Sequence, residues 1–198
     1  MFLASIWTLP LGRLPHNLVS MTTTHTTTQA ANAARSADAT PGTPIPVRLD
    51  FDQYAAGFSR AMAHLDRAAT KELDNADIDP RLRELVRIRA SQLNGCAYCV
   101  DMHTKDARAI GETEQRLYAL AVWRETPFFS PRERAALAFT EEVTLVATTH
   151  VPDEAYSAVA AEFGQAEIGA LISLIVTINA WNAISVASRV WEPGSYQP

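Results

Sequence analysis

Four residues near the middle of the chain carry side chains that could do chemistry together. Cys96 and Cys99 are the only cysteines in the sequence, so neither can pair elsewhere in its own chain. His103 follows the second thiol by four residues, and Glu84 precedes the first by twelve. Residues three and four apart share one face of a helix, so this spacing brings both thiols and the imidazole together. A thiol pair beside a proton carrier predicts redox chemistry.

Each of these residue types has a physical reason to be present. The reactive form of cysteine is the thiolate, which a helix N-terminus favours through its partial positive charge and free N–H groups. Histidine can exchange a proton near neutral pH, and Glu84 can orient the imidazole or pass a proton through water. The second thiol can resolve an oxidised sulfur as a disulfide, because an i, i+3 pair at a helix start brings both sulfurs within bonding reach.

The surrounding sequence predicts a helical hairpin that positions these side chains. Asp79-Pro80 is typical of a helix start, and Asn94-Gly95 is typical of a helix end. A second helix is predicted over residues 96–110. In an antiparallel hairpin, residues at similar distances from the turn face each other. Glu84 and His103 meet this condition, so we expect their carboxylate and imidazole to approach each other across the hairpin.

Other interpretations of the cysteine pair are weaker. A structural zinc site normally needs four ligands, and only His103 and Glu84 could complete the set with the two thiols. Haem attachment requires histidine directly after the second cysteine, where Val100 stands. Thioredoxin-type chemistry requires a βαβ setting, and no strand pattern flanks the motif. Two inert thiols on a core face remain the structural alternative. We assign no metal to these residues.

The run from Glu84 to His103 resembles the core of the AhpD-like alkylhydroperoxidase branch of the carboxymuconolactone decarboxylase superfamily. It follows the pattern E-x11-C-x-x-C-x3-H, and a looser all-helical resemblance extends over residues 50–191. The resemblance implies an all-α fold, a homotrimer or hexamer, and peroxide reduction with no bound cofactor. It also implies Cys99 as the thiol that attacks peroxide and Cys96 as the resolving thiol. His103 and Glu84 would form the proton relay.

The expected function is therefore a thiol-dependent peroxidase of the alkylhydroperoxidase type. An external thiol or dithiol must reduce the disulfide; the family suggests a lipoyl protein, with thioredoxin- or glutathione-type donors as alternatives. Tyr98 stands where the best-known hydroperoxidases of the family carry histidine, which leaves the physiological substrate open. Two other functions also stay open. A carboxymuconolactone decarboxylase-like lyase should survive loss of both thiols, and a non-enzymatic redox-sensing helical oligomer should oxidise without turnover.

Composition limits the partners and the compartment. The 198-residue chain has a formal net charge of −5 and no basic run, so we do not expect it to bind nucleic acid. One C-x-x-C pair without further cysteines suits a reducing cytoplasm better than a disulfide-stapled secreted fold. Residues 168–188 carry no charge and could span a bilayer by length. Their polar residues and the lack of a basic flank favour a buried helix, partly against a neighbouring subunit, rather than a membrane span.

The chain divides into an N-terminal extension, residues 1–45, and one helical domain, residues 46–198. The extension contains a threonine-rich stretch at 21–28 and several prolines, which predicts disorder. Met21 is as good a candidate for the true start as Met1. In the domain, helical periodicity with capping residues and no strand pattern predicts an all-α, AhpD-like fold of six or seven helices.

Other helices of the domain can be placed from their capping residues. Asp50 precedes an apolar stripe at helical spacing, made of Phe51, Tyr54, Ala55, Phe58, Met62, Leu65 and Ala69. Ser130-Pro131-Arg132-Glu133 is a capping box with proline at the first helical position. The last helix is expected over residues 165–190. We expect Asn179 and Asn182 on it to form hydrogen bonds in the core rather than to act in catalysis.

Overall fold

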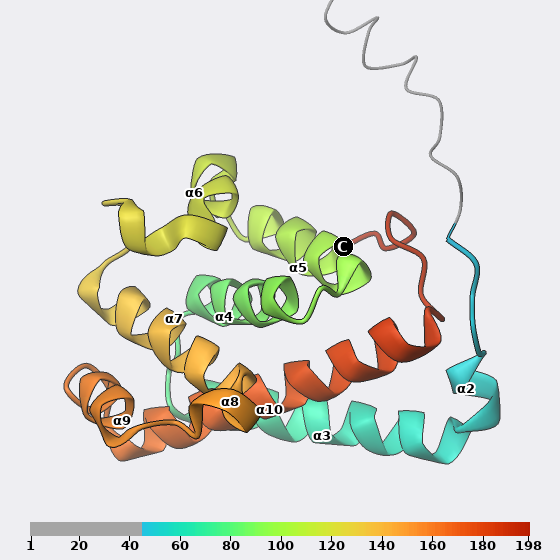
Figure 1. Cartoon of the computed structure of the whole chain (residues 1–198), viewed down its shortest axis with the longest axis horizontal. Coiled ribbons are helices and arrows are strands. Elements are labelled where there is room, and N and C mark those ends of the chain that lie inside the picture. Colours follow the sequence, from blue (N-terminus) through green and yellow to red (C-terminus); the bar gives the residue numbers. More distant parts are fainter. Residues whose placement is uncertain (1–44) are drawn as a thin grey trace, which may run out of the picture. The chain divides into compact units, whose positions relative to one another are not determined.

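The structure, a computed structural model, describes residues 45–198. This part of the chain is all-α and contains no strand, as the sequence predicts (Figure 1). Seven α-helices have six residues or more: α3 (Ala56–Asn75), α4 (Pro80–Leu93), α5 (Ala97–Ala109), α6 (Glu114–Ala119), α7 (Pro131–Thr144), α9 (Asp153–Ala160) and α10 (Gln165–Ser188). Three short elements accompany them: α2 (Phe51–Tyr54), α8 (Val146–Thr149) and the 3-10 helix η1 (Leu120–Glu125). The predicted extension, residues 1–45, falls almost wholly outside the described residues.

Two of the long helices begin where their capping residues predict. The Asp79 side chain accepts a hydrogen bond from the Arg81 amide at 2.7 Å, directly before Pro80 opens α4. At the start of α7, Ser130 Oγ accepts from the Glu133 amide at 3.2 Å. Glu133 Oε2 accepts in return from the Ser130 amide at 2.8 Å, which completes the capping box. These local bonds satisfy amides that a helix start leaves free.

The first apolar stripe is less buried than the sequence predicts. The helix breaks at Ala55, where φ is −127° and ψ is 36°, so α2 and α3 are separate. Met62 and Ala69 are buried, because this part of α3 packs along α10. Tyr54 and Phe58, earlier in the stripe, are 74% and 56% exposed. The stripe therefore extends beyond the surface that α10 covers within one chain.

Helix α4 lies at the centre of the domain and takes part in both hydrophobic clusters (Figure 1). Leu82 and Val86 pack in a cluster with residues of α3, α7, α9 and α10. Leu85 and Ile88 pack in a second cluster with residues of α5, α6, η1 and α7. Because apolar side chains hold α4 on both sides, the polar residues that it carries occupy fixed positions.

Helix α10 is a core helix with buried residues on several sides. Asn182 is fully buried and donates to Ser91 Oγ at 3.0 Å, and Asn179 accepts from Asn94, so both asparagines form the predicted core hydrogen bonds. Among the described residues α10 is the one helix long and apolar enough to cross a membrane, with a mean hydropathy of 1.7. Half of that window is buried inside the domain, and the core helix of a soluble protein can have the same length and composition, so these alone do not indicate a membrane location.

The last ten residues, 189–198, which we call the C-terminal segment, turn back across α5 (Figure 1). Arg189 adopts a left-handed conformation with φ of 54° and ends α10. Lys105 Nζ on α5 then donates to the Tyr196 carbonyl oxygen at 2.9 Å, and the Gly194 amide donates to Asp101 Oδ2 at 2.9 Å. The segment thus covers the helix that carries the second cysteine and the histidine.

Candidate active site

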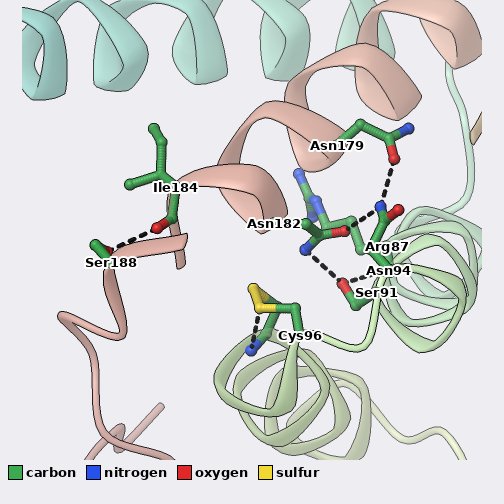
Figure 2. The surroundings of a disulfide bond; sticks show 9 residues. Arg87, Ser91, Asn94, Cys96, Asn179, Asn182, Ile184 and Ser188 are labelled. Atoms are coloured by element: carbon green, nitrogen blue, oxygen red, sulfur yellow. Dashed lines mark hydrogen bonds between the residues drawn. A yellow bond between two sulfur atoms is a disulfide. The ribbon is translucent and has the colours of Figure 1, made fainter. Parts of the chain in front are cut away.

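Helices α4 and α5 pack against each other as the predicted hairpin. Gly95 in the turn adopts φ of 67°, a conformation that glycine takes without steric cost, and Cys96 is the N-cap residue of α5. The turn is also tied to α10. Asn94 donates to Asn182 Oδ1 at 3.0 Å, and Asn182 donates in turn to Ser91 on α4 (Figure 2). The start of α5 is therefore held by two other helices.

Cys96 and Cys99 are joined by a disulfide, with their Cα atoms 5.3 Å apart (Figure 2). Both side chains are buried, and the Cys99 amide donates to Cys96 Sγ at 3.3 Å. The Cys96 sulfur thus lies against the free amides of the helix N-terminus, which would favour a thiolate there after reduction. Cys99 lines the cavity described below, whereas Cys96 does not. The helix N-terminus therefore favours Cys96 as the thiolate, whereas access to the cavity favours Cys99 as the attacking thiol.

Glu84 and His103 meet across the hairpin, which confirms the predicted register. His103 Nδ1 lies 2.9 Å from Glu84 Oε2, and both side chains are buried. The other carboxylate oxygen, Oε1, accepts a hydrogen bond from Arg87, one turn further along α4. The carboxylate is thus held between an imidazole and a guanidinium. Within residues 45–198, Nε2 of His103 has no hydrogen-bond partner.

The surroundings of Glu84 keep it ionised. Burial is the largest single influence and by itself would raise the pKa of this carboxyl. The hydrogen bond to His103 and the charges of Arg87 and His103 together outweigh burial, so the pKa of Glu84 lies below its ordinary value of 4.5. An ionised carboxylate can only accept, so His103 Nδ1 carries the proton that it donates to Glu84.

Asp106 adds a second carboxylate near the same ring nitrogen of His103. Its Oδ2 lies 3.9 Å from His103 Nδ1, and its Oδ1 accepts from the Tyr196 hydroxyl at 2.7 Å. Atoms of Glu84, His103 and Asp106 that could bind a metal ion lie within 4.8 Å of one another. This group contains Asp106 and neither cysteine, unlike the zinc site considered from the sequence. A cation there would compete with Arg87 for Glu84, so we assign no metal to the group.

A cavity of about 380 Å³ opens beside the disulfide. Its walls come from α3, α4, α5, α10 and the C-terminal segment, and its lining residues are Asp66, Arg87, Tyr98, Cys99, Met102, His103, Asp106, Leu174, Ile178, Trp181 and Trp191. Cys99 and His103 are one helical turn apart on α5 and face this common space. A substrate in the cavity would therefore reach a sulfur of the pair and an imidazole at the same time.

Sequence reasoning found the four central residues but not the rest of the site. Arg87 and Asp106 could have been found, because each lies three positions after Glu84 or His103 and so shares a helical face with it. Trp181 and Trp191 carried no comparable signal. Their place in the cavity depends on how α10 and the C-terminal segment pack on the hairpin.

Comparison with known proteins places the chain in a family. Residues 56–142, which include the hairpin, match the carboxymuconolactone decarboxylase family. The uncharacterized protein YdfG of Bacillus subtilis is 48% identical over 117 residues, which are 59% of this chain and 80% of YdfG. The sequence similarity therefore extends over most of that relative.

Solved structures agree with this placement. A protein of unknown function from Agrobacterium tumefaciens, ATU0492, provisionally named as an antioxidant defence protein AhpD, superposes with a TM-score of 0.68 at 34% identity. The match covers 77% of this chain and 99% of ATU0492. An uncharacterized peroxidase-related protein from Ralstonia eutropha, described as an alkylhydroperoxidase AhpD core, shares the fold with a TM-score of 0.53 at 19% identity, over 79% of this chain and 95% of that protein. This chain belongs to the carboxymuconolactone decarboxylase family, in its AhpD-like branch.

Proposed function

We propose that the protein is a thiol-dependent peroxidase that reduces hydroperoxides with its Cys96–Cys99 pair. One observation supports this most strongly: Cys99 of the disulfide and His103, oriented by Glu84, line the same cavity. A sulfur that can be oxidised and a group that can carry protons are what peroxide reduction requires.

In the first step of the proposed reaction, the Cys99 thiolate attacks the outer oxygen of a hydroperoxide R–O–O–H. The S–O bond forms as the O–O bond breaks, and Cys99 becomes a sulfenic acid. The departing RO⁻ takes a proton and leaves as the alcohol ROH. His103 can supply this proton from Nε2, because Nδ1 is engaged with Glu84. Glu84 stabilises the charged imidazole through the same hydrogen bond and so acts as a positioning residue.

In the second step, Cys96 attacks the Cys99 sulfenic acid. The S–S bond forms, and hydroxide leaves with a proton as water. An external dithiol then exchanges with the disulfide and restores both thiols. The complete cycle converts a dithiol and ROOH into a disulfide, ROH and water. The oxidised pair in the structure corresponds to the state that awaits reduction.

The setting of this activity is part of the proposal. We expect the reductant to be an external thiol or dithiol, such as a lipoyl protein, and the compartment to be a reducing cytoplasm. We also expect a homo-oligomer, a trimer or hexamer. Support comes from apolar side chains that one chain leaves exposed on α2, α3 and α10: Tyr54, Phe58, Leu65, Ile172, Val176 and Val186.

The test measures peroxide consumption in the presence of dihydrolipoamide or dithiothreitol, together with mass spectrometry of the cysteines. Cys99→Ser is expected to abolish turnover. Cys96→Ser is expected to allow one oxidation event and then stall at a sulfenic acid on Cys99, open to further oxidation. If the helix N-terminus instead makes Cys96 the attacking thiol, the two variants will exchange these behaviours. Equal turnover by wild type and Cys99→Ser would refute the proposal.

The same variants separate this proposal from its alternatives. A lyase of the decarboxylase type keeps its activity when both cysteines are replaced by serine. A redox sensor forms the disulfide with peroxide but shows no turnover with any of the dithiols. Circular dichroism of each variant, compared with the wild type, establishes that a loss of activity does not come from unfolding.

A further inference from the structure

The cavity has an aromatic wall built from three separate parts of the chain. Tyr98 comes from α5, Trp181 from α10 and Trp191 from the C-terminal segment. The Trp191 ring centroid lies 5.6 Å from that of Tyr98 and 5.6 Å from that of Trp181. Both separations fall in the range of about 4.5–7 Å at which aromatic rings attract each other. Trp191 therefore joins the other two rings into one continuous surface.

Trp191 is held in place by a contact outside this wall. Its indole Nε1–H donates to Asp52 Oδ2 on α2 at 3.0 Å. The indole ring has a single hydrogen-bond donor, and this bond uses it. What Trp191 offers to the cavity is therefore apolar ring surface rather than a hydrogen bond. Its place in the wall also depends on the path of the C-terminal segment.

The end of that segment is anchored on α5. The Tyr196 hydroxyl donates to Asp106 Oδ1 at 2.7 Å, and Lys105 Nζ donates to the Tyr196 carbonyl oxygen at 2.9 Å. The hydrogen bond to Asp106, with smaller effects of burial and negative charge, raises the pKa of Tyr196 to about 12, so the hydroxyl remains a donor at neutral pH. These bonds hold the segment, and with it Trp191, over the cavity.

The charges around the cavity disfavour an anionic ligand. Asp66 and Asp106 contribute two carboxylates to its lining, against one guanidinium, that of Arg87. Arg87 is already paired with Glu84, so it is not free to bind a carboxylate of the substrate. An anion in this space would meet two carboxylates, and Glu84 already neutralises the guanidinium beside them.

The size of the cavity suits a ring-bearing molecule. A cavity of about 150 Å³ is enough to hold benzene, and small-molecule sites begin at about 300 Å³. At about 380 Å³, this cavity has room for a phenyl group and the peroxide beside Cys99. Hydrogen peroxide would leave the aromatic wall without a contact.

We propose that Trp191 is a specificity-determining residue, and that the site selects uncharged hydroperoxides that carry an aromatic ring. The ring stacks on the aromatic wall while the O–O bond lies at Cys99 and His103. This inference rests on the proposed function, because the reaction it describes is the same two-thiol reduction of ROOH to ROH and water.

The kinetic test compares two hydroperoxides with the same tertiary carbon. Cumene hydroperoxide carries a phenyl group where tert-butyl hydroperoxide carries a methyl group. We expect the wild type to have a higher kcat/KM for cumene hydroperoxide than for tert-butyl hydroperoxide. Trp191→Ala is expected to reduce this ratio about tenfold, which is the order of the effect when a pocket loses an apolar contact. Trp191→Phe keeps a ring and is expected to retain most of the preference. Tyr156→Ala, an exposed aromatic residue on α9 away from the cavity, is the matched control.

Trp191→Leu keeps apolar bulk without a ring and serves if the alanine variant does not fold. An unchanged cumene-to-tert-butyl ratio in Trp191→Ala, or in Trp191→Leu where the alanine variant does not fold, would overturn the inference. A loss of the same size with both peroxides would also overturn it, because it would show a structural role only. Either result would leave the peroxidase function standing.

A binding experiment tests the inference even if the peroxidase function fails. Isothermal titration of the oxidised protein with the product alcohol 2-phenyl-2-propanol is expected to show binding that weakens about tenfold in Trp191→Ala. Its para-carboxylate analogue is expected to bind more weakly than the neutral alcohol. Equal affinity of wild type and Trp191→Ala for the alcohol, or a preference for the carboxylate, would contradict the inference whatever the reaction is.

Discussion

Replacing Glu84 with glutamine tests both the stability and the chemistry of the site. Glutamine keeps the size of the side chain and one oxygen that can accept from His103. It cannot accept from His103 and Arg87 through two charged oxygens, as Glu84 does. The perturbation therefore removes one charge-assisted hydrogen bond and the negative charge between the buried His103 and the partly buried Arg87.

The expected loss of stability follows from this geometry. A hydrogen bond to a charged group contributes about 1.5–3 kcal/mol to the free energy of unfolding. Removing one partner of a fully buried ion pair costs about 3–5 kcal/mol, but the Arg87 side chain is 16% exposed and water can reach part of it. We therefore expect Glu84→Gln to lower the free energy of unfolding by about 2–3 kcal/mol at pH 7. For a domain of this size, that corresponds to a fall in Tm of roughly 4–12 °C.

The chemistry should be affected more strongly than the stability. Without the carboxylate, the imidazolium that forms during proton transfer loses its stabilising charge, so peroxide turnover is expected to slow about 10²–10⁴-fold. If Glu84 acts only through His103, the double variant Glu84→Gln/His103→Gln will be little slower than the slower single variant. Thermal unfolding and steady-state peroxide consumption on the same preparations give both numbers.

Glu125→Gln is the matched control, because Glu125 is an exposed glutamate at the end of η1. Its effect on the free energy of unfolding is expected to stay within about 0.5 kcal/mol. A Glu84→Gln protein as stable as wild type would mean that the carboxylate is not held as the structure shows. A variant that is destabilised but fully active would refute the relay while leaving the fold intact.

Three further predictions concern the histidine, acid stability and assembly. His103→Gln is expected to slow turnover about 10²–10⁴-fold, whereas His64→Gln, an exposed histidine on α3, is expected to behave as wild type in the same assay. The native pKa values of Glu84 and Glu141 lie below the ordinary value of 4.5, so both carboxylates stabilise the fold above pH 4.5 and lose this contribution as the pH falls through their native pKa values. Urea unfolding between pH 6 and pH 3 should show this loss of stability, and the loss should be smaller in Glu84→Gln. Light scattering at micromolar concentration is expected to give the mass of a trimer or hexamer, and a monodisperse monomer would contradict the proposed assembly.

The features that the sequence predicted correctly are those that neighbouring residues determine. Asp79-Pro80 and Ser130–Glu133 place helix starts because the capping bonds form within a few residues. The turn at Gly95 fixes the register of the hairpin, and the register places Glu84 opposite His103. Helix periodicity and one tight turn were sufficient to bring the central residues of the site together.

The features that the sequence did not predict depend on residues far apart in the chain. Glu141 on α7 looks like a surface glutamate, yet it is buried, and both Arg89 of α4 and the Trp123 indole N–H of η1 donate to it. The exposed face of α3 follows from where α10 stops covering it. No local pattern reports such contacts, since the partners of Glu141 lie on other helices, 18 and 52 residues away.

The same distinction separates the chemistry of the site from its selectivity. The thiol pair and the Glu84–His103 pair all lie on α4 and α5, so a single hairpin specifies what reaction can occur. The aromatic wall draws on α10 and the C-terminal segment, which reach the hairpin only in the folded domain. A change in the segment can therefore alter which hydroperoxide fits without altering the sulfur chemistry. If this division holds, truncation after residue 188 should remove the preference for ring-bearing substrates and leave disulfide formation by hydrogen peroxide detectable. Loss of both together would mean that the segment also holds the hairpin in its reactive form.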